Sequence, residues 1–222
     1  SIGLSSGKWY WEFTMRNGNT NERSCYIVQS TATSGIYQIH SGVGTWDSYY
    51  SYNGNAYDSV SGSVAYGNSY TAGDVIGCAL DLDNKAIWWS KNGTWQNSAT
   101  EGEIEAGTTT NAANTGLADG VWTPCYQGNA SSQDCDANFG QASYSGTQPE
   151  GFLDINTANL ATPTILDGTA YFQPTLYTGD GSVRNIDQTG NSTFQPDMVW
   201  IKNRSQADNH MLIDAARGVT KQ

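Results

Sequence analysis

The most regular alternation of hydrophobic and polar positions in the chain lies within residues 73–93. Apolar side chains recur there at every second position, namely Ile76, Cys78, Leu80 and Leu82. This period of two is typical of a strand with one buried face. The chain returns through residues 86–90, so the stretch predicts a β-hairpin, which we expect at the centre of a β-sandwich.

Two turn signals bound the returning strand. Asp83 and Asn84 precede it, and Asn tolerates the left-handed conformation that a tight hairpin needs. Asn92 and Gly93 follow it, and this pair is the strongest short hairpin signal.

A second clear alternation, in residues 8–15, gives a strand with an aromatic face. Its inward positions are expected to be Trp9, Trp11, Phe13 and Met15. Further strands are predicted at residues 24–28, 36–39 and 120–126. Residues 46–70 suggest short strands joined by long loops, and residues 96–120 form a polar insertion.

The pattern changes after residue 143. We expect a β-sandwich over residues 1–143, a turn-rich linker over 144–169, and the incomplete start of a small β-rich module over 170–222. The last part is too short to bury much core alone. The fold class is therefore all-β, an antiparallel sandwich followed by a second β-rich unit.

Composition narrows the function. The 222 residues carry a formal net charge of −11 with 14% charged residues, and Tyr (13) and Trp (8) are abundant. A strongly acidic chain is a poor nucleic-acid binder, because phosphate recognition needs clustered Lys and Arg. The chain has no apolar run near 18 residues, so no membrane insertion is expected. It does not start with Met, and we interpret it as a fragment.

The four cysteines divide into two pairs. Cys25 and Cys78 lie in apolar strand patterns and are expected to be buried thiols. Cys125 and Cys135 flank a polar loop, where a disulfide and two free thiols are both open. The spacing does not favour zinc.

Candidate chemistry is sparse, and no catalytic residue, metal site or cofactor is predicted. Glu101, Glu103 and Glu105 share one face if extended, but a solvated loop is the preferred interpretation over a glycosidase pair. Glu12 is expected to point outward or to pair with a base. The turn explains Asp81, Asp83 and Asn84 better than Ca²⁺ does. The lone His40 and His210 give no support for nucleophilic catalysis.

Aromatic residues supply the candidate surface. Trp46, Tyr49, Tyr50, Tyr52 and Tyr57 lie in loop-like sequence among Asn, Asp and Ser. Such rings suit a sugar or a protein partner. Packing inside the sandwich explains the same residues, and both interpretations stay open. Of the adjacent Trp88 and Trp89, one must face away from the other.

Four separated motifs, at residues 6–13, 73–84, 89–93 and 138–141, resemble the SPRY domain in order and spacing. The resemblance covers roughly residues 1–141 and implies a bent antiparallel sandwich of the concanavalin A-like class. Lys85 departs from it, because such domains often have Gly after the turn Asn.

The C-terminal segment resembles a module found beside SPRY-like domains in tailed-phage proteins, especially those of marine phages. The motifs include residues 149–152, 177–181, 194–204 and 217–221. This resemblance implies a structural protein of the virion, located in an external appendage such as a tail fibre. It would self-associate, as a trimer if it is a fibre, and contact other virion proteins and a host-surface glycan or protein.

Three functions remain in competition. The first is a non-enzymatic virion appendage that uses its SPRY-like domain for assembly or host attachment. The second is a protein-interaction module of a cellular protein. The third is a carbohydrate-active enzyme, which would need two carboxylates converging in a cleft.

Overall fold

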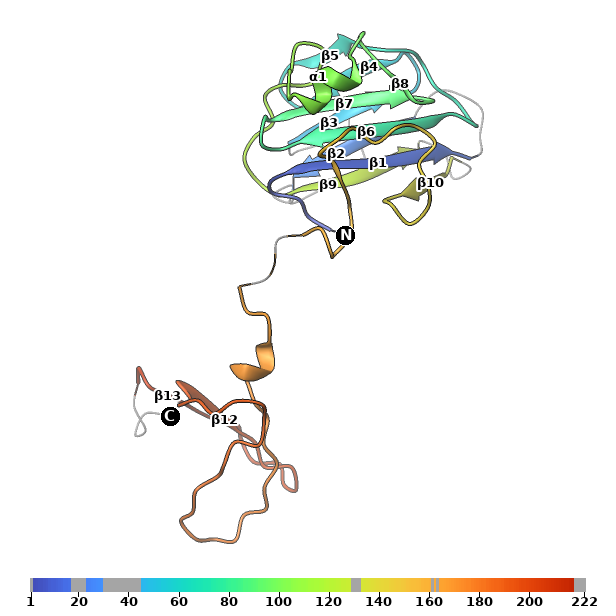
Figure 1. Cartoon of the computed structure of the whole chain (residues 1–222). Coiled ribbons are helices and arrows are strands. Elements are labelled where there is room, and N and C mark those ends of the chain that lie inside the picture. The colour runs from blue at the N-terminus through green and yellow to red at the C-terminus, as the bar shows by residue number, and fades with distance from the viewer. Residues whose placement is uncertain are drawn as a thin grey trace. The chain divides into compact units, whose positions relative to one another are not determined.

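The computed structural model describes residues 2–16, 23–29, 45–128, 133–160, 162 and 164–217. The strand predicted at 36–39 and His40 lie outside the described residues. The chain divides into two compact units, Ser1–Leu160 and Ala161–Gln222 (Figure 1). Almost every described element is a strand, and the sheets of the first unit are antiparallel apart from one short pair, so the all-β prediction is confirmed.

Two stacked sheets build the first unit. The six-stranded sheet contains β1 (Lys8–Met15), β6 (Val75–Asp81), β7 (Ala86–Lys91), β8 (Thr94–Trp95), β10 (Cys135–Asn138) and β11 (Leu153–Asp154). Its order is β10-β1-β6-β7-β8, and β11 also pairs with β1. The predicted hairpin is β6–β7, and β6 is the central strand of this order, as expected.

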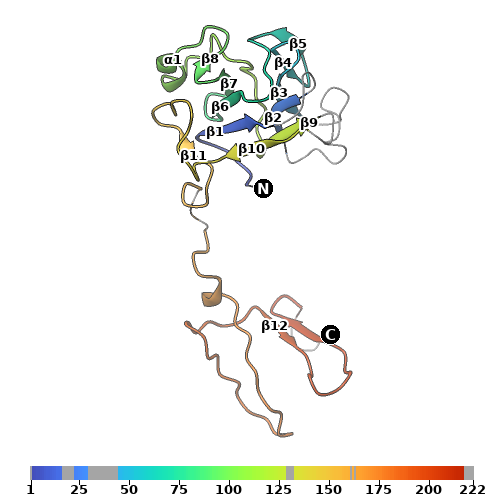
Figure 2. The ribbon, with the colours of Figure 1, turned by 90° about the vertical axis from the view of Figure 1, so that its right-hand side faces the viewer.

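The opposite sheet has five strands. These are β2 (Arg23–Gln29), β3 (Trp46–Tyr50), β4 (Asn55–Asp58), β5 (Gly62–Ala65) and β9 (Trp122–Gly128). Their order is β5-β4-β3-β2-β9, so β5 and β9 are its edges. Figure 2 shows the two sheets side by side, with β6 and β7 next to β2 and β3.

Between the sheets lies an aromatic core. The alternating residues of β1 and β6 all belong to it, together with Trp89, Trp122, Cys25 and Cys78. Trp11 meets Trp89 edge-to-face, with ring centroids 6.5 Å apart. The predicted core faces and the two buried thiols are therefore confirmed.

A second, smaller core covers the outer face of the six-stranded sheet. Trp88 faces it while Trp89 faces the main core, which is how the two adjacent rings are both buried. Its covering layer includes Ile104 of α1 (Glu101–Glu105) and Phe152. Part of the polar insertion at 96–120 is thus packed on the sheet, and α1 lies outside β6 and β7 in Figure 2.

The acids at Glu101, Glu103 and Glu105 form neither a strand face nor a solvated loop, so that expectation was wrong. Thr100 caps a short helix by accepting from the Glu103 backbone N–H, and the Glu103 carboxylate accepts from the Thr100 N–H. This reciprocal capping box explains the helix. Glu105 accepts a bond from the Glu150 N–H instead of facing a second acid.

Glu12 also differs from its prediction. The side chain is 3% exposed and has no basic partner among the described residues. Its carboxylate accepts from the Tyr10 hydroxyl (2.9 Å) and from the backbone N–H groups of Ser145 (2.8 Å) and Gly146 (2.7 Å). An acid on β1 therefore holds the segment that follows β10 against the sheet.

The segment that the sequence suggested as a linker begins as part of the sandwich. Tyr144 packs edge-to-face on Tyr10 at 4.7 Å, and Phe152 and Ile155 are buried. β11 pairs in parallel with β1. Packing against the first unit accordingly continues to Leu160, where the division between the two units falls.

The two remaining cysteines are free thiols. Cys135 is on β10 and packs against the main core. Cys125 is on β9, in the other sheet, and faces Tyr26 in the strand register. The two side chains belong to different sheets, so the loop between them is not closed by a disulfide.

The β6–β7 turn is built around a buried carboxylate. Asp81 accepts from the backbone N–H groups of Asp83 (3.1 Å) and Asn84 (2.9 Å). The left-handed residue is Lys85, with φ 58°, and not Asn84. β7 starts at the next residue, Ala86. A lysine therefore adopts the left-handed conformation at the position where SPRY domains often have Gly. At the next turn Asn92 and Gly93 both have positive φ, as predicted.

Lys85→Gly is expected to stabilise the protein by up to about 1 kcal/mol, because glycine adopts the left-handed conformation without the Cβ penalty. The variant also loses the ion pair between Lys85 and Asp119. Lys85→Ala loses the same pair and keeps the penalty, so it is the matched control. Urea unfolding of both variants measures the difference, and a glycine variant no more stable than the alanine variant would contradict it.

The second unit contains little regular structure. Its described residues form a short 3-10 helix, Gly168–Ala170, and one antiparallel hairpin, β12 (Met198–Ile201) with β13 (Met211–Asp214). These two strands are the only ones in the described part of this unit. Residues 171–172, 175–177 and 183–186 are not strands.

Candidate functional site

A cluster of tyrosine rings lies at the turn between β3 and β4. The Tyr50 ring is 6.3 Å from that of Tyr52 and 5.7 Å from that of Tyr57, the second pair edge-to-face. Tyr52 is 61% exposed, and Tyr50 and Tyr57 are half-buried. We call these three residues, with Asn53 and Asn55, the tyrosine patch.

The strand register decides which aromatic residues reach this surface. Successive residues of β3 point to opposite faces of the sheet. Tyr49 points inward, is fully buried, and packs against Trp89 and Tyr70, with ring centroids 6.3 and 5.0 Å away. Its inclusion in the candidate surface was therefore wrong.

Trp46 is not part of the ring cluster either. It is half-buried at the opposite end of β3 from Tyr50, and it pairs with Val28 of β2. Of the five predicted surface aromatics, the structure brings together Tyr50, Tyr52 and Tyr57.

Amide side chains complete the patch. Asn53 donates from Nδ2 to the Tyr57 hydroxyl (3.1 Å) and accepts from the Asn55 N–H (3.0 Å). Asn55 donates to the Ser63 hydroxyl (2.7 Å). These amides were not singled out from the sequence, although the Asn-Gly-Asn segment between tyrosines is a visible signal of a tight polar turn.

Gly54 fixes this turn. It has φ +73°, and a Cβ there would lie 2.2 Å from the carbonyl oxygen of Gly67. Its N–H donates to Tyr50 O (3.0 Å), and its own carbonyl accepts from the Gly67 N–H (2.8 Å). These two backbone hydrogen bonds fix the turn that carries the Tyr50, Tyr52 and Tyr57 rings.

The edge strand beside the patch is β5. Its four residues are all exposed, and it pairs with β4 so that Tyr57 lies opposite Ser63. An edge strand presents N–H and C=O groups that an incoming strand can pair with. The tyrosine patch, with its aromatic rings and amide groups, therefore lies next to the β5 edge of the sheet.

A buried acid, Asp47, lies on the inner side of β3. Asp47 is 3% exposed, accepts a hydrogen bond from Asn114 Nδ2, and faces Asp58 across the β3–β4 pair. Burial raises the pKa of Asp47 to about 7, and the Asp58 charge adds to this. The Asn114 bond works in the opposite direction.

Three other groups considered for metal binding or catalysis, Asp81, Asp83 and His210, have hydrogen-bond partners within the protein. Asp83 accepts from the Gly7 N–H, and Asp81 is bound by its own turn. His210 accepts from Trp200 Nε1 at 2.7 Å. Within the described ranges, no three His, Cys, Asp or Glu side chains gather as metal ligands. The Glu103 carboxylate is used in the capping box of α1, and the Glu105 carboxylate accepts from the Glu150 N–H.

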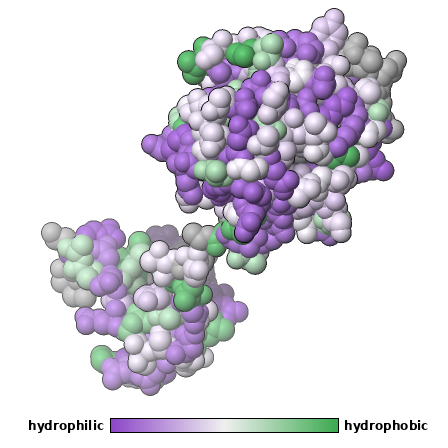
Figure 3. Space-filling model, turned by 45° about the horizontal axis from the view of Figure 1, so that its top comes forward, coloured by the Kyte–Doolittle hydropathy of each residue, from purple (hydrophilic) through white to green (hydrophobic). Residues whose placement is uncertain are grey.

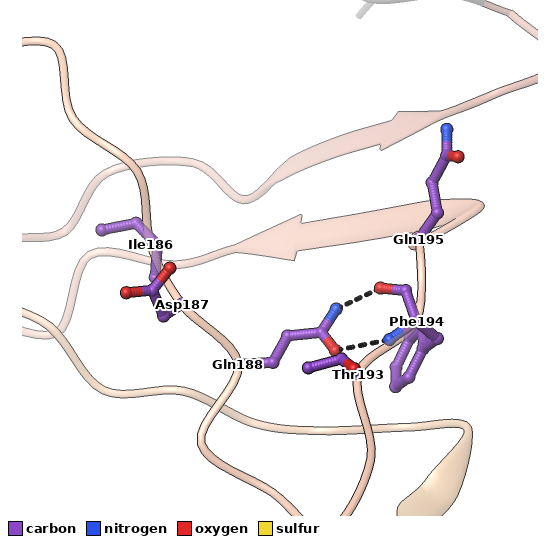
Figure 4. A pocket seen from close by; sticks show the side chains of 6 residues that line it. All are labelled: Ile186, Asp187, Gln188, Thr193, Phe194 and Gln195. Atoms are coloured by element: carbon purple, nitrogen blue, oxygen red, sulfur yellow. Dashed lines mark hydrogen bonds between the residues drawn. The ribbon is translucent and has the colours of Figure 1, made fainter.

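The second unit has a hollow lined by residues 186–188 and 193–195 (Figure 4). Gln188 spans it by donating to Phe194 O (2.6 Å) and accepting from the Phe194 N–H (3.0 Å). The amide that would meet a ligand is thus used to close a loop, and the hollow is not a candidate site.

Among the described residues, the structure contains no helix with the length and apolar character of a membrane span.

A family match assigns residues 167–222 to a domain of unknown function (DUF7483). The chain is 30% identical over 94 residues to the dual specificity protein kinase splA of Dictyostelium discoideum. The aligned region covers 41% of this chain and 4% of that protein. The chain therefore spans only a small part of that relative.

Among solved structures, the SPRY domain of human HERC1 is similar, with 20% identity and a TM-score of 0.47 over 64% of this chain and 81% of that one. The SPRY domain family matches residues 8–142, more than half of the chain. This range contains the β1 strand, the β6–β7 hairpin and residues 138–141, where the sequence motifs lie. The chain belongs to the SPRY domain family.

Proposed function

We propose that the sandwich is a non-catalytic protein-interaction module that binds an extended peptide at the tyrosine patch. Membership of the SPRY family supports a protein partner, because SPRY domains generally serve as interaction modules. The observation that carries the choice of site is the Tyr50–Tyr52–Tyr57 ring cluster beside the open β5 edge.

The mode of binding follows from the register. A peptide that pairs with β5 extends the sheet, and every second side chain then lies on the same face as Ser63 and Tyr57. The exposed Tyr52 ring supplies contact area at small entropic cost. The Asn53 and Asn55 amides provide hydrogen bonds at the rim.

The charge of the first unit favours a partner that is not acidic. Residues 1–160 hold 15 acidic and 5 basic residues. Like charges slow association and weaken binding, whereas a neutral or basic peptide is attracted. The peptide is therefore expected to carry no net negative charge.

Tyr52→Ala is expected to weaken peptide binding by about 10-fold or more, in the range usual for an aromatic anchor at an interface. Peptides selected from a displayed random library against the chain are measured by titration calorimetry with each variant. Val60→Ala is the matched control, because Val60 is 90% exposed in the β4–β5 turn and outside the ring cluster.

Equal affinity of Tyr52→Ala, Tyr57→Ala and the unchanged protein for the selected peptides would refute the patch as the site. A glycan array with the same variants tests the other ligand class that rings and amides fit. Glycan binding that Tyr52→Ala abolishes, with no peptide selected, would reassign the ligand from peptide to sugar.

The virion appendage expected from the C-terminal segment is a separate proposal. Its location and its partners, other virion proteins and a host surface, rest on that resemblance alone, since the family matched at 167–222 has no known function. Immunogold electron microscopy of phage particles with antibody to this chain is the direct test. Unlabelled appendages on particles would remove the virion role and leave the interaction module intact.

A further inference from the structure

A buried carboxylate lies at one end of the β1–β6 strand pair, against the side-chain nitrogens of a lysine and an asparagine. The first unit is mainly hydrophilic on the face shown in Figure 3, but Asp81 is 0% exposed. Its Oδ2 atom is 3.4 Å from Lys8 Nζ and accepts a hydrogen bond from Asn84 Nδ2 at 2.8 Å. An amine, a carboxamide and a carboxylate therefore meet at one oxygen atom.

The other oxygen of Asp81 is held by the backbone. Oδ1 accepts from the N–H groups of Asp83 (3.1 Å) and Asn84 (2.9 Å). These two bonds belong to the β6–β7 turn, and they also fix the direction of the carboxylate. Oδ2 is therefore a proton acceptor that is positioned before any reaction takes place.

The Lys8 amine is held in place from three sides. Lys8 lies opposite Asp81 in the β1–β6 register, so both side chains are on the same face of the sheet. Its Nζ donates to Glu105 O at the end of α1 (2.9 Å) and lies 5.4 Å from the centre of the Phe152 ring. The Lys8 side chain is 23% exposed, so most of it is covered.

The Asn84 amide lies under the same end of α1. Asn84 as a residue is exposed, but a Cβ at Gly107 would lie 2.5 Å from its Nδ2 and 3.1 Å from its Cγ. Gly107 comes two residues after Glu105, which binds the amine. The end of α1 therefore packs against both the amine and the amide.

This grouping supplies what an amine needs to displace ammonia from a carboxamide. Free in water the reaction is very slow, but holding the two groups together raises their effective concentration by orders of magnitude. A carboxylate that takes protons from the attacking nitrogen and gives them to the leaving nitrogen lowers the barrier further. Asp81 Oδ2 contacts both of these nitrogens.

We propose that Lys8 and Asn84 form an intramolecular amide bond, with Asp81 carrying protons between their two nitrogens. Lys8 Nζ attacks Asn84 Cγ, so the Nζ–Cγ bond forms and the Cγ–Nδ2 bond breaks. The ammonium has three protons and the carboxamide has two. One stays on the new amide nitrogen, and four leave with Nδ2 as ammonium, two of them by way of Asp81. Nothing is oxidised or reduced.

The product is a covalent link between the start of β1 and the β6–β7 turn, next to the strand pair at the centre of the six-stranded sheet. The new amide keeps one N–H, which donates to Asp81 Oδ2, so the buried carboxylate retains a partner for that oxygen. The link is independent of peptide binding at the tyrosine patch.

The test is the intact mass of the folded full chain after prolonged incubation at about pH 8, since the attack needs an unprotonated amine. The mass is expected to fall below the sequence mass by about 17 Da, the mass of ammonia. Tryptic digestion is expected to give a peptide pair joined through Lys8 and Asn84, with no cleavage after Lys8.

Two variants remove one reacting group each. Lys8→Arg keeps a positive charge beside Asp81 but has no amine, and Asn84→Ala has no carboxamide. Both are expected to keep the full sequence mass, with circular dichroism to check that they fold. Lys85→Arg is the matched control, because Lys85 is the neighbouring lysine of the same turn, and it is expected to lose ammonia like the unchanged protein.

The variants also separate the link from another reaction of the same mass. An Asn-Gly pair such as Asn92-Gly93 loses ammonia when it closes to a succinimide, which needs no lysine. A loss that persists in Lys8→Arg would therefore overturn the proposal. The full sequence mass in the folded unchanged protein after incubation would overturn it as well, because the three groups would then form only the ion pair and the hydrogen bond.

Discussion

Asp47→Asn is expected to stabilise the protein strongly at pH 8 and hardly at pH 4. Asp47 is buried beside Asp58, and its pKa is raised from the ordinary 3.8 to about 7. At pH 8 the folded protein must hold a buried carboxylate, whereas the unfolded chain exposes the same charge to water. Asparagine has the same shape and an oxygen that accepts the Asn114 bond, but no charge.

The direction with pH follows from the raised pKa. Below about 3.8 the carboxyl is protonated in both states, and its contribution to stability is fully present. As pH rises from there to about 7, the unfolded chain loses its proton first, and this contribution is lost. The whole change corresponds to roughly 4 kcal/mol as an upper limit, at 1.36 kcal/mol for each pH unit.

Urea unfolding between pH 4 and pH 8 measures the effect as the difference between Asp47→Asn and the unchanged protein. Taking the difference removes the titration of the other acids except Asp58, whose charge acts on Asp47. Asp136→Asn is the control, since Asp136 is an exposed acid on β10 paired with Arg16. Parallel pH profiles for Asp47→Asn and the unchanged protein would show that burial does not penalise the Asp47 charge.

Glu12→Gln is expected to destabilise the sandwich by roughly 1–3 kcal/mol, the range for leaving a buried donor without its acceptor. The carboxylate accepts from Tyr10, Ser145 and Gly146 with both oxygens. Glutamine replaces one oxygen with an NH₂ group, which faces a backbone N–H as donor against donor. The change keeps size and shape, so the loss comes from the hydrogen bonds.

The variant should also release the segment that Glu12 holds. Limited proteolysis is expected to cut within residues 143–152 faster in Glu12→Gln, because Tyr144 and Phe152 then pack less firmly on the sheet. Glu150→Gln, an exposed acid in the same segment, is the control and should behave as the unchanged protein. Unfolding at the same urea concentration and unchanged cleavage would refute the role of Glu12.

The inward face of each predicted strand was readable from the sequence because alternation is a local property. Every second residue of β1 and β6 enters the main core, and no distant information is needed to see this. The Asn92-Gly93 turn was equally readable, since glycine and asparagine adopt positive φ at low energy. The order and spacing of such local signals also carried the resemblance to SPRY domains.

The outer faces were not readable in the same way. Tyr10, Trp88 and Glu12 alternate with core residues, so the pattern predicts exposure, yet α1 and the segment after β10 bury them. Those covering segments are polar in sequence and are recognised as a second layer only when the fold brings them to the sheet. The same limit explains why the insertion at 96–120 and the start of the predicted linker were taken for surface.

The sequence alone determined the fold class, an all-β sandwich of SPRY type. It also determined that residues 46–57, which supply the candidate site, are rich in Tyr, Asn and Gly. Only the tertiary structure decided which rings face outward, because a shift of one residue in strand register exchanges the two faces. That register buries Tyr49 against Trp89, groups Tyr50, Tyr52 and Tyr57 beside β5, and encloses Asp47. The sequence shows which residue types are present. Which of them lie close together depends on the pairing of strands that are distant in sequence.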